Sequence, residues 1–373
     1  MSVLASVPPA YGQGSLADLL PSLLAVLTGR GAGVADGDRL GLGAGPLAGV
    51  RKVAVLLIDG LGWHQLPVAA PLAPTLADLA TGRLGAALRL TAGFPSTTPT
   101  SLVTLGTGTA PGGHGVLGFT VRVPGTGRVL NHIHWGTDPD PASWQPVRTV
   151  FERAAEAGVA TAVVTRPQFA GSGLTVAAYR GASFVPAAGP VELAAELLAA
   201  LGSAPAPALV YGYHPEVDHA GHVAGVDSPE WRAAVAGTDE LIAAVVAGLP
   251  PDAALVVTAD HGQLNVPDSH RVDCDADPAL LAGVEVIAGE PRVRYVHTVP
   301  GAAADVAAAW RERLGPIATV LTRQEAIATG WYGPVDPRHA ERIGDVVAVC
   351  ADRYALVATG REPSAVARLV ADH

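Results

Sequence analysis

Acidic and histidine side chains follow three apolar segments of this chain. These side chains are Asp59, Asp218, His222, Asp260 and His261. Carboxylate and imidazole groups are the ligands with which proteins hold zinc and similar divalent ions. Each group alone is commonplace, because an Asp after a strand often caps a helix or forms a turn. Their recurrence after three separate segments predicts a shared metal site.

The apolar segments also predict the fold class. The sequence has four continuous apolar runs, at 53–58, 160–164, 208–213 and 253–258, three of which precede the side chains above. Such runs are typical of buried parallel strands. Helical patterns separate them, so the sequence predicts an α/β fold with a doubly wound, mostly parallel sheet flanked by helices. Ligands bind at the carboxyl ends of the strands in such sheets. The acidic and histidine side chains stand at these ends.

A candidate nucleophile lies in the segment FPSTTPTSLVTLGTG. A short strand at 87–91 is expected to lead into a helix that begins near Pro99, because proline is favoured at the first helical position and threonine caps well before it. Thr98 would then lie at the positive end of the helix dipole, which stabilises an alkoxide. Thr97 and Ser96 are close alternatives, and a threonine here can also serve only as a cap.

The composition excludes several classes of protein. The chain has 373 residues, 49% of them apolar and 16% charged, which excludes a disordered protein. Its net charge of −10 does not favour a nucleic-acid polymer or an anionic membrane as partner. The motifs of P-loop proteins, Gly-x-Ser-x-Gly hydrolases and His-Glu-x-x-His metalloproteases are absent from the sequence. An acidic protein that binds phosphate would need local positive charge, which a metal ion can supply.

One large catalytic domain is expected at 51–373, after an N-terminal helical extension at 1–50 that packs on the core. A separate strand–helix–strand pattern predicts a small cap at about 263–335. The apolar stretch at 19–27 is too short to span a bilayer, and no basic residue precedes Arg30, so neither a membrane span nor a secretory signal is expected. A cytoplasmic location follows as the expectation, and two distant cysteines agree with a reducing compartment.

The order of the candidate residues, with a late histidine, resembles the alkaline phosphatase superfamily and, within it, the type I phosphodiesterase/nucleotide pyrophosphatase family. That family has a threonine nucleophile at a helix start and a Thr-Gly pair nine residues later; here such a pair begins at Thr107, which favours Thr98 over Thr97. The sequence PGGHG at 111–115 is similar to the family's Pro-x-x-His-Gly, and DHAGH and TADHG are similar to its two metal motifs. The likeness covers 51–373.

This resemblance implies two divalent metal ions, with zinc as the expected ion. One ion would be held by Asp59, Thr98, Asp260 and His261, and the other by Asp218, His222 and His373. His339 is the alternative to His373. The resemblance also implies a hydrolase that cleaves phosphodiester or pyrophosphate bonds of small, nucleotide-type substrates through a phospho-threonine intermediate.

Other functions fit the same motifs. A phosphomonoesterase, a phosphonate hydrolase or a mutase of the superfamily would use a similar site, and a non-catalytic relative could bind metal alone. No arginine is evident near Thr98 to bind the dianionic end of a monoester, which favours diesters. Trp63 and Tyr213 are expected to pack in the core, although they could stack on a nucleobase. His132 and His134 are expected to form a surface pair, although they could touch substrate.

Overall fold

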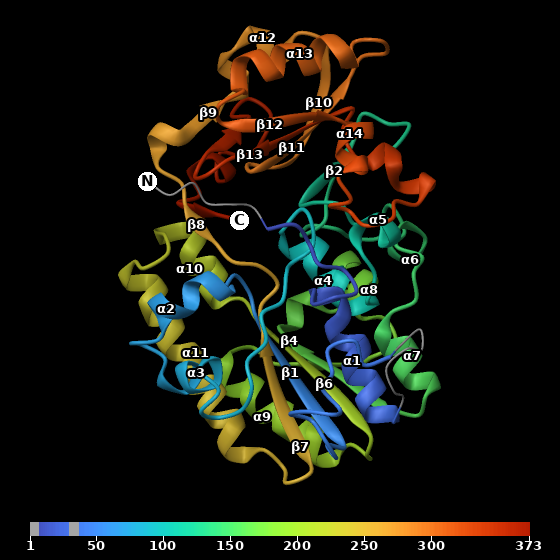
Figure 1. Ribbon diagram of the computed structural model, residues 1–373, viewed down its shortest axis with the longest axis vertical. Helices are drawn as coiled ribbons and strands as arrows, with labels where there is room; N and C mark the ends of the chain where they lie inside the picture. Colours follow the sequence, from blue (N-terminus) through green and yellow to red (C-terminus); the bar gives the residue numbers. More distant parts are fainter. Residues whose placement is uncertain (1–6, 30–36) are drawn as a thin grey trace.

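A five-stranded parallel sheet forms the centre of the larger part of the molecule (Figure 1), and the computed structural model describes residues 7–29 and 37–373. The strands lie in the order β5, β4, β6, β1, β7, and all of them run parallel. They span Ser183–Pro186 (β5), Ala160–Thr165 (β4), Ala208–His214 (β6), Lys52–Ile58 (β1) and Ala253–Thr258 (β7). The predicted fold class is confirmed, with the edge strand β5 as an addition that the sequence patterns did not predict.

Helices cover both faces of this sheet. Strand β1 is buried along its whole length. Because successive side chains of a strand point to opposite faces of the sheet, those of β1 enter two apolar cores alternately. Val53 and Val55 join the core of α1, α4, α7 and α8, and Ala54 and Leu56 join the core of α3, α9, α10 and α11. The first set spans Leu16–Thr28 (α1), Thr98–Thr107 (α4), Val150–Glu156 (α7) and Gly173–Tyr179 (α8). The second set spans Pro74–Ala80 (α3), Pro190–Ser203 (α9), Glu216–Ala224 (α10) and Pro229–Gly248 (α11).

A second, antiparallel sheet lies beyond the carboxyl ends of the parallel strands (Figure 1) and has the strand order β10, β11, β13, β12. Its strands span Val284–Glu290 (β10), Val293–Thr298 (β11), Ala318–Thr322 (β12) and Val346–Cys350 (β13). Helices α12 (Pro278–Leu281) and α13 (Ala303–Leu314) pack on one face around Trp310. The other face joins the core of α4 through Tyr295, whose hydroxyl donates to the carbonyl of Leu117 at 2.7 Å.

Shorter elements connect these layers. The helices are α2 (Leu66–Ala69), α5 (Pro111–His114), α6 (Pro141–Trp144) and α14 (Arg323–Ala328). The strands are β2 (Thr120–Arg122), β3 (Val129–Asn131), β8 (Leu264–Asn265), β9 (Arg271–Asp273), β14 (Ala355–Val357) and β15 (Ala371–Asp372). The boundaries at 1–50 and 263–335 stay predictions, and residues 1–6 and 30–36 of the first lie outside the described residues. No helix in the described ranges is both long and apolar enough to cross a membrane.

The approach to α4 differs from the prediction. The expected strand at 87–91 does not form, and only Thr91 makes an isolated bridge, with Ser15, because no neighbouring strand pairs with this segment. Helix α4 begins at Thr98, with Thr97 as the residue before the first turn, so it starts one residue earlier than the position of Pro99 suggested. Thr98 therefore lies within the first helical turn.

The burial of His132 corrects the expected surface pair of His132 and His134. His132 is fully buried: its Nδ1 lies 2.8 Å from the carbonyl of Gly118, and its Nε2 accepts from Trp144 Nε1 at 3.2 Å. The guanidinium of Arg342 lies 3.6 Å from the centre of the Trp144 ring. Only His134 is exposed. Burial, together with the positive charge of Arg342, lowers the pKa of His132 to about 4.

We expect the protein to lose stability in acid through this histidine. The unfolded chain binds a proton on His132 near pH 6.5 and the folded chain does so only near pH 4, so the stabilisation is present above 6.5 and is lost as the pH falls toward 4. The free energy of unfolding should fall by about 1.4 kcal/mol per pH unit in this window. Denaturant unfolding of His132→Gln should show a shallower slope by that amount, and the exposed His134→Gln should keep the wild-type slope. Equal slopes in wild type and His132→Gln would contradict the assignment.

Candidate metal centre and nucleophile

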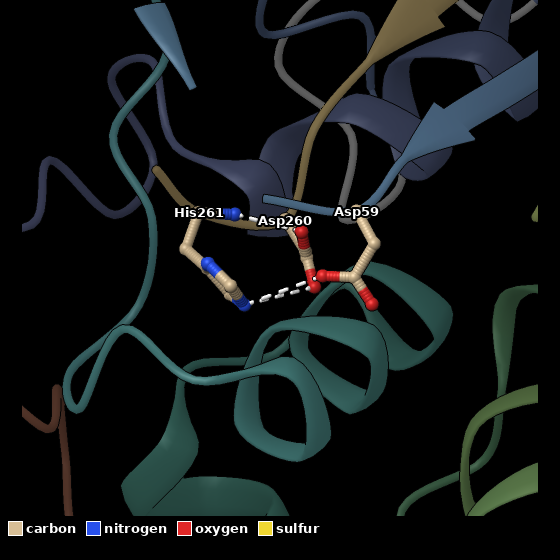
Figure 2. Close-up of side chains that lie close together, drawn as sticks. All are labelled: Asp59, Asp260 and His261. Atoms are coloured by element: carbon tan, nitrogen blue, oxygen red, sulfur yellow. Dashed lines mark hydrogen bonds and ion pairs between the residues drawn. The ribbon is translucent and has the colours of Figure 1, made fainter. Parts of the chain in front are cut away.

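Asp59, Asp260 and His261 form a buried group where the neighbouring strands β1 and β7 end (Figure 2), with 2%, 0% and 4% of each residue exposed. One ligand atom from each lies within 4.8 Å of the others. His261 Nε2 is 3.4 Å from Asp59 Oδ1 and 3.4 Å from Asp260 Oδ2. The opposite oxygen of Asp260 accepts from the backbone N–H groups of Gly60 and His261 at 3.1 and 3.0 Å, which fixes the carboxylate. The remaining oxygen faces the group.

Thr98 brings a hydroxyl to the same place. Its Oγ1 lies 3.0 Å from His261 Nε2 and 3.4 Å from Asp59 Oδ1. Since α4 begins at Thr98, the backbone N–H groups of its first turn have no carbonyl partner within the helix and point their partial positive charge toward this site. The arrangement places a hydroxyl, two carboxylates and an imidazole around one point, next to a helix N-terminus.

Asp218, His222 and His373 form a second, more open group beside the first. Asp218 and His222 lie on one face of α10, four residues apart, and His222 Nε2 is 3.3 Å from Asp218 Oδ1. Their side chains are 16% and 18% exposed. The ring of His373 connects the groups, because its centre is 5.5 Å from that of His222 and 4.1 Å from that of His261. The seven side chains singled out by the sequence are thus brought together.

Backbone pairing holds His373 in place. The preceding strand β15 pairs with β8, and the N–H of Val370 donates to the carbonyl of His222 at 2.7 Å. The guanidinium of Arg271 donates to the carbonyls of Ala367, at 3.2 Å, and Leu369. Hydrogen bonds to β8, His222 and Arg271 therefore fix the position of the segment that carries His373.

The imidazoles are oriented for metal binding. His261 Nδ1 lies 3.2 Å from the carbonyl of Gly262, and His222 Nδ1 lies 2.8 Å from the carbonyl of Ala371. A carbonyl only accepts, so Nδ1 carries the hydrogen in both rings and Nε2 presents its lone pair to the carboxylates. Backbone carbonyls orient metal-bound histidines in this way.

The spacing of the donor atoms fits a divalent ion. Ligand atoms at about 2.0–2.2 Å from zinc in a tetrahedron are about 3.4 Å apart. The distances from His261 Nε2 to Asp59, Asp260 and Thr98 are 3.4, 3.4 and 3.0 Å. Within the described part of the chain, Asp260 Oδ2 and His373 Nδ1 are buried without a hydrogen-bond partner. Buried polar atoms are costly without a partner, so this buried Asp/Asp/His group is consistent with metal binding.

The electrostatics of the donor group agree with this conclusion. Burial raises the pKa of Asp59 well above its usual range, and the negative charges of Asp260 and Asp218 raise it further. Several carboxylates crowded together in a buried site repel one another unless a cation or protons neutralise them.

Two supporting side chains were not predicted. Gln263 donates from Nε2 to Asp218, at 2.7 Å to its Oδ1 and 3.0 Å to its carbonyl, and so orients a ligand of the second group. The hydroxyl of Tyr213 donates to Asp59 Oδ2, so this residue contacts the site rather than only packing in the core. Gln263 lies two residues after His261 in the sequence, but a glutamine outside any motif gives no signal of its contact with α10.

Other expectations are corrected by the structure. His339, the alternative to His373, is buried against a different segment, with Nδ1 3.1 Å from the carbonyl of Gly112. Trp63 was expected in the core but is 41% exposed, because it starts a short helical turn at the surface after β1.

Glycines allow the elements of the site to approach closely. A Cβ added to Gly60 would lie 2.9 Å from the Cα, Cβ and Oδ1 of Asp218, and Gly60 has φ +73°. A Cβ added to Gly62 would lie 2.6 Å from the Cα of Gly262. The loop after β1 can therefore contact both α10 and the loop after β7 only without side chains at these positions.

We expect Gly60→Ala to displace Asp218 and to destabilise the fold by about 2 kcal/mol or more, because it adds a clash to the roughly 1–2 kcal/mol for a left-handed residue. Gly41→Ala is the matched control, since Gly41 has φ +69° but no atom within 4 Å of an added Cβ. Denaturant unfolding and metal content of the purified variants measure both effects. Equal losses of stability, with full metal content in both variants, would show that the approach of Gly60 to Asp218 has no consequence.

Comparisons with known proteins agree with this fold. The murine ectonucleotide pyrophosphatase/phosphodiesterase 5 is similar in structure, with a TM-score of 0.67 and 19% identity over 86% of this chain and 83% of that chain. The human protein of that name has a TM-score of 0.63 and 17% identity over 86% and 83%. A phosphonoacetate hydrolase from Sinorhizobium meliloti 1021 has a TM-score of 0.62 and 20% identity over 84% of each chain. No curated protein matches the chain by sequence.

The fold is the α/β architecture of alkaline-phosphatase-like proteins. Residues 53–373 match the family described as type I phosphodiesterase/nucleotide pyrophosphatase. The chain belongs to this family and is a hydrolase of it, and the family implies a small phosphoester as substrate.

Proposed function

We propose that this enzyme cleaves phosphodiester or pyrophosphate bonds of nucleotide-type substrates, with two divalent ions, expected to be zinc, and with Thr98 as the nucleophile. The observation that carries the proposal is the position of Thr98 Oγ1, within 3.4 Å of Asp59 and His261 at the start of α4. A murine structure similar to this chain is of an inactive variant with threonine replaced by alanine, in complex with AMP, which supports a nucleophilic threonine and a nucleotide substrate.

In this mechanism the Thr98 oxygen attacks phosphorus and forms a phospho-threonine, and the leaving alkoxide or phosphate departs on the opposite side. The N–H groups at the start of α4 stabilise the charge that develops on the phosphoryl oxygens. Water then attacks phosphorus and releases Thr98. Bound metal ions would lower the pKa of the nucleophile and neutralise anionic oxygens. Asp59, Thr98, Asp260 and His261 would hold one ion; Asp218, His222 and His373 would hold the other.

The test is the hydrolysis of bis-(p-nitrophenyl) phosphate with added zinc and after chelation. We expect turnover that disappears on chelation and returns with zinc, and that exceeds the rate on p-nitrophenyl phosphate. Faster hydrolysis of the monoester, or of phosphonoacetate, would instead assign a phosphomonoesterase or phosphonate hydrolase. No turnover with zinc, manganese or another divalent ion would assign a non-catalytic relative, and the metal content would then show whether it binds metal.

A further inference from the structure

Residues 358–373, which we call the docking segment, supply one ligand of the second donor group and orient another. His373 is the ligand that the segment carries, and its ring centre lies 5.5 Å from that of His222. The carbonyl of Ala371 lies 2.8 Å from His222 Nδ1 and holds the hydrogen there, which directs the lone pair of Nε2 to the donor group. The N–H of Val370 donates to the carbonyl of His222 at 2.7 Å. The second donor group is therefore complete only while the segment is docked.

The first donor group is held by other parts of the fold. Asp59 follows β1, and Asp260 and His261 follow β7. The backbone N–H of His261 fixes Asp260 at 3.0 Å, and the carbonyl of Gly262 lies 3.2 Å from His261 Nδ1, so both side chains are oriented within their own loop. Undocking of residues 358–373 would thus take apart the second donor group and leave these ligands of the first in place.

A buried ion pair anchors the docking segment to the second sheet. Arg294 lies on β11 with its side chain 0% exposed, and it donates to both carboxylate oxygens of Glu362, from Nη2 to Oε2 at 2.7 Å. Its Nε donates to the carbonyl of Leu356 at 2.8 Å. Two-point contacts between a guanidinium and a carboxylate are strong, and removing one partner of a buried pair leaves an uncompensated charge. The pairing of Arg294 therefore favours the docked segment.

A second arginine holds the docking segment between this anchor and His373. The guanidinium of Arg271, on β9, donates to the carbonyl of Ala367 at 3.2 Å and to that of Leu369. The same group donates to the carbonyl of Val266 at 3.1 Å, in the chain that follows β8. Since β8 pairs with β15, the contacts run without interruption from the second sheet to the second donor group.

We propose that Arg294, Glu362 and Arg271 are positioning residues for the second metal ion. Docking of residues 358–373 and binding of that ion are then one coupled equilibrium, in which each favours the other to the same extent. The second sheet sets how tightly the second ion is held, and the first ion is held independently of it. The proposal rests on the proposed function in taking the second donor group as a metal site.

The first test is a zinc titration in competition with a chromogenic chelator. Glu362→Gln removes the charge of the anchor and keeps its shape. We expect one zinc equivalent to bind at least about fivefold more weakly than in wild type, and the other to stay within about twofold. Glu285→Gln is the matched control, because it breaks an ion pair of β10, with Arg122 at 3.3 Å, outside the docking segment. Both equivalents should keep their wild-type affinities in this control.

The split between the two equivalents separates positioning from a general loss of stability, which would weaken both. Wild-type affinity for both equivalents in Glu362→Gln, or equal weakening of both, would overturn the proposal. Where Glu362→Gln does not fold, Arg271→Met takes its place, since it removes the donors to Ala367 and Leu369 and keeps the apolar part of the side chain.

Trypsin provides a second measurement, on the wild-type protein. Arg368 is exposed, but the carbonyls on both sides of it are bonded to Arg271, so cleavage after Arg368 requires undocking. Zinc at ten times the dissociation constant of the second site lowers the undocked population about 10-fold. We expect cleavage after Arg368 to slow by about that factor when zinc is added to chelated protein. Cleavage after the exposed Arg83, outside the segment, is the internal reference.

Cleavage after Arg368 that does not depend on zinc would overturn the proposal, even in a protein that hydrolyses the bis-aryl phosphate. Zinc protection of Arg368, together with the split affinities of Glu362→Gln, would support it without reference to turnover. If such a protein hydrolyses none of the three phosphorus substrates, the proposed function fails while the coupling of the docking segment to the second ion stands.

Discussion

Replacing Thr98 by alanine should lower the turnover of a phosphodiester at least about 1,000-fold, because the variant lacks the oxygen that forms the covalent intermediate. The fold should be retained, since the side chain of Thr98 lies at the start of α4 and does not carry its apolar packing. Wild-type protein quenched during turnover should carry the mass of one phosphoryl group, and the variant should carry none. Steady-state kinetics and intact-protein mass spectrometry measure the two outcomes.

Thr98→Ser is the matched variant, because it keeps the hydroxyl and removes only a methyl group. We expect it to retain the phospho-enzyme and to stay within about 100-fold of the wild-type rate. Full turnover in Thr98→Ala would reject Thr98 as the nucleophile, and the site of phosphorylation in the chain would then decide between Thr97 and Ser96.

Replacing His222 by alanine should remove about one metal equivalent and lower kcat/KM at least about 100-fold, because the second ion would lose a ligand and the leaving group its counter-charge. Asp218 would also lose the partner that lies 3.3 Å from its carboxylate.

His219→Ala provides the control on the same helix, since His219 is exposed on α10. Metal analysis of the purified variants and hydrolysis of the bis-aryl phosphate give the comparison. We expect wild-type metal content and rate for His219→Ala. Two metal equivalents and full activity in His222→Ala would show that the second group holds no catalytic ion.

Local sequence patterns were sufficient for four of the five strands of the parallel sheet and for the acidic and histidine residues that follow them. The strands at 53–58, 160–164, 208–213 and 253–258 are all present, because a strand covered by helices on both faces is continuously apolar. The segment at 87–91 shows where such patterns fail. A strand needs a neighbouring edge, and this segment has only the single bridge between Thr91 and Ser15.

Buried polar contacts could not be predicted in the same way. His132 and His339 stand in polar surroundings in the sequence, yet both are buried, because partners from distant segments satisfy their ring nitrogens. The contact of Gln263 with Asp218 spans 45 residues and has no local periodicity. Whether a polar side chain is buried depends on such partners, and they are set by the packing of the helices and sheets.

The sequence by itself determined the types of residue at the strand ends, and the order of strands and helices that brings Asp59, Asp218 and Asp260 to one edge of the sheet. It did so because parallel strands align their carboxyl ends whatever their spacing in the chain. Only the tertiary structure decided the distances among the donor atoms and the close approach allowed by Gly60. These depend on how the second sheet and the segment before His373 pack against the first sheet, over separations that local patterns do not encode.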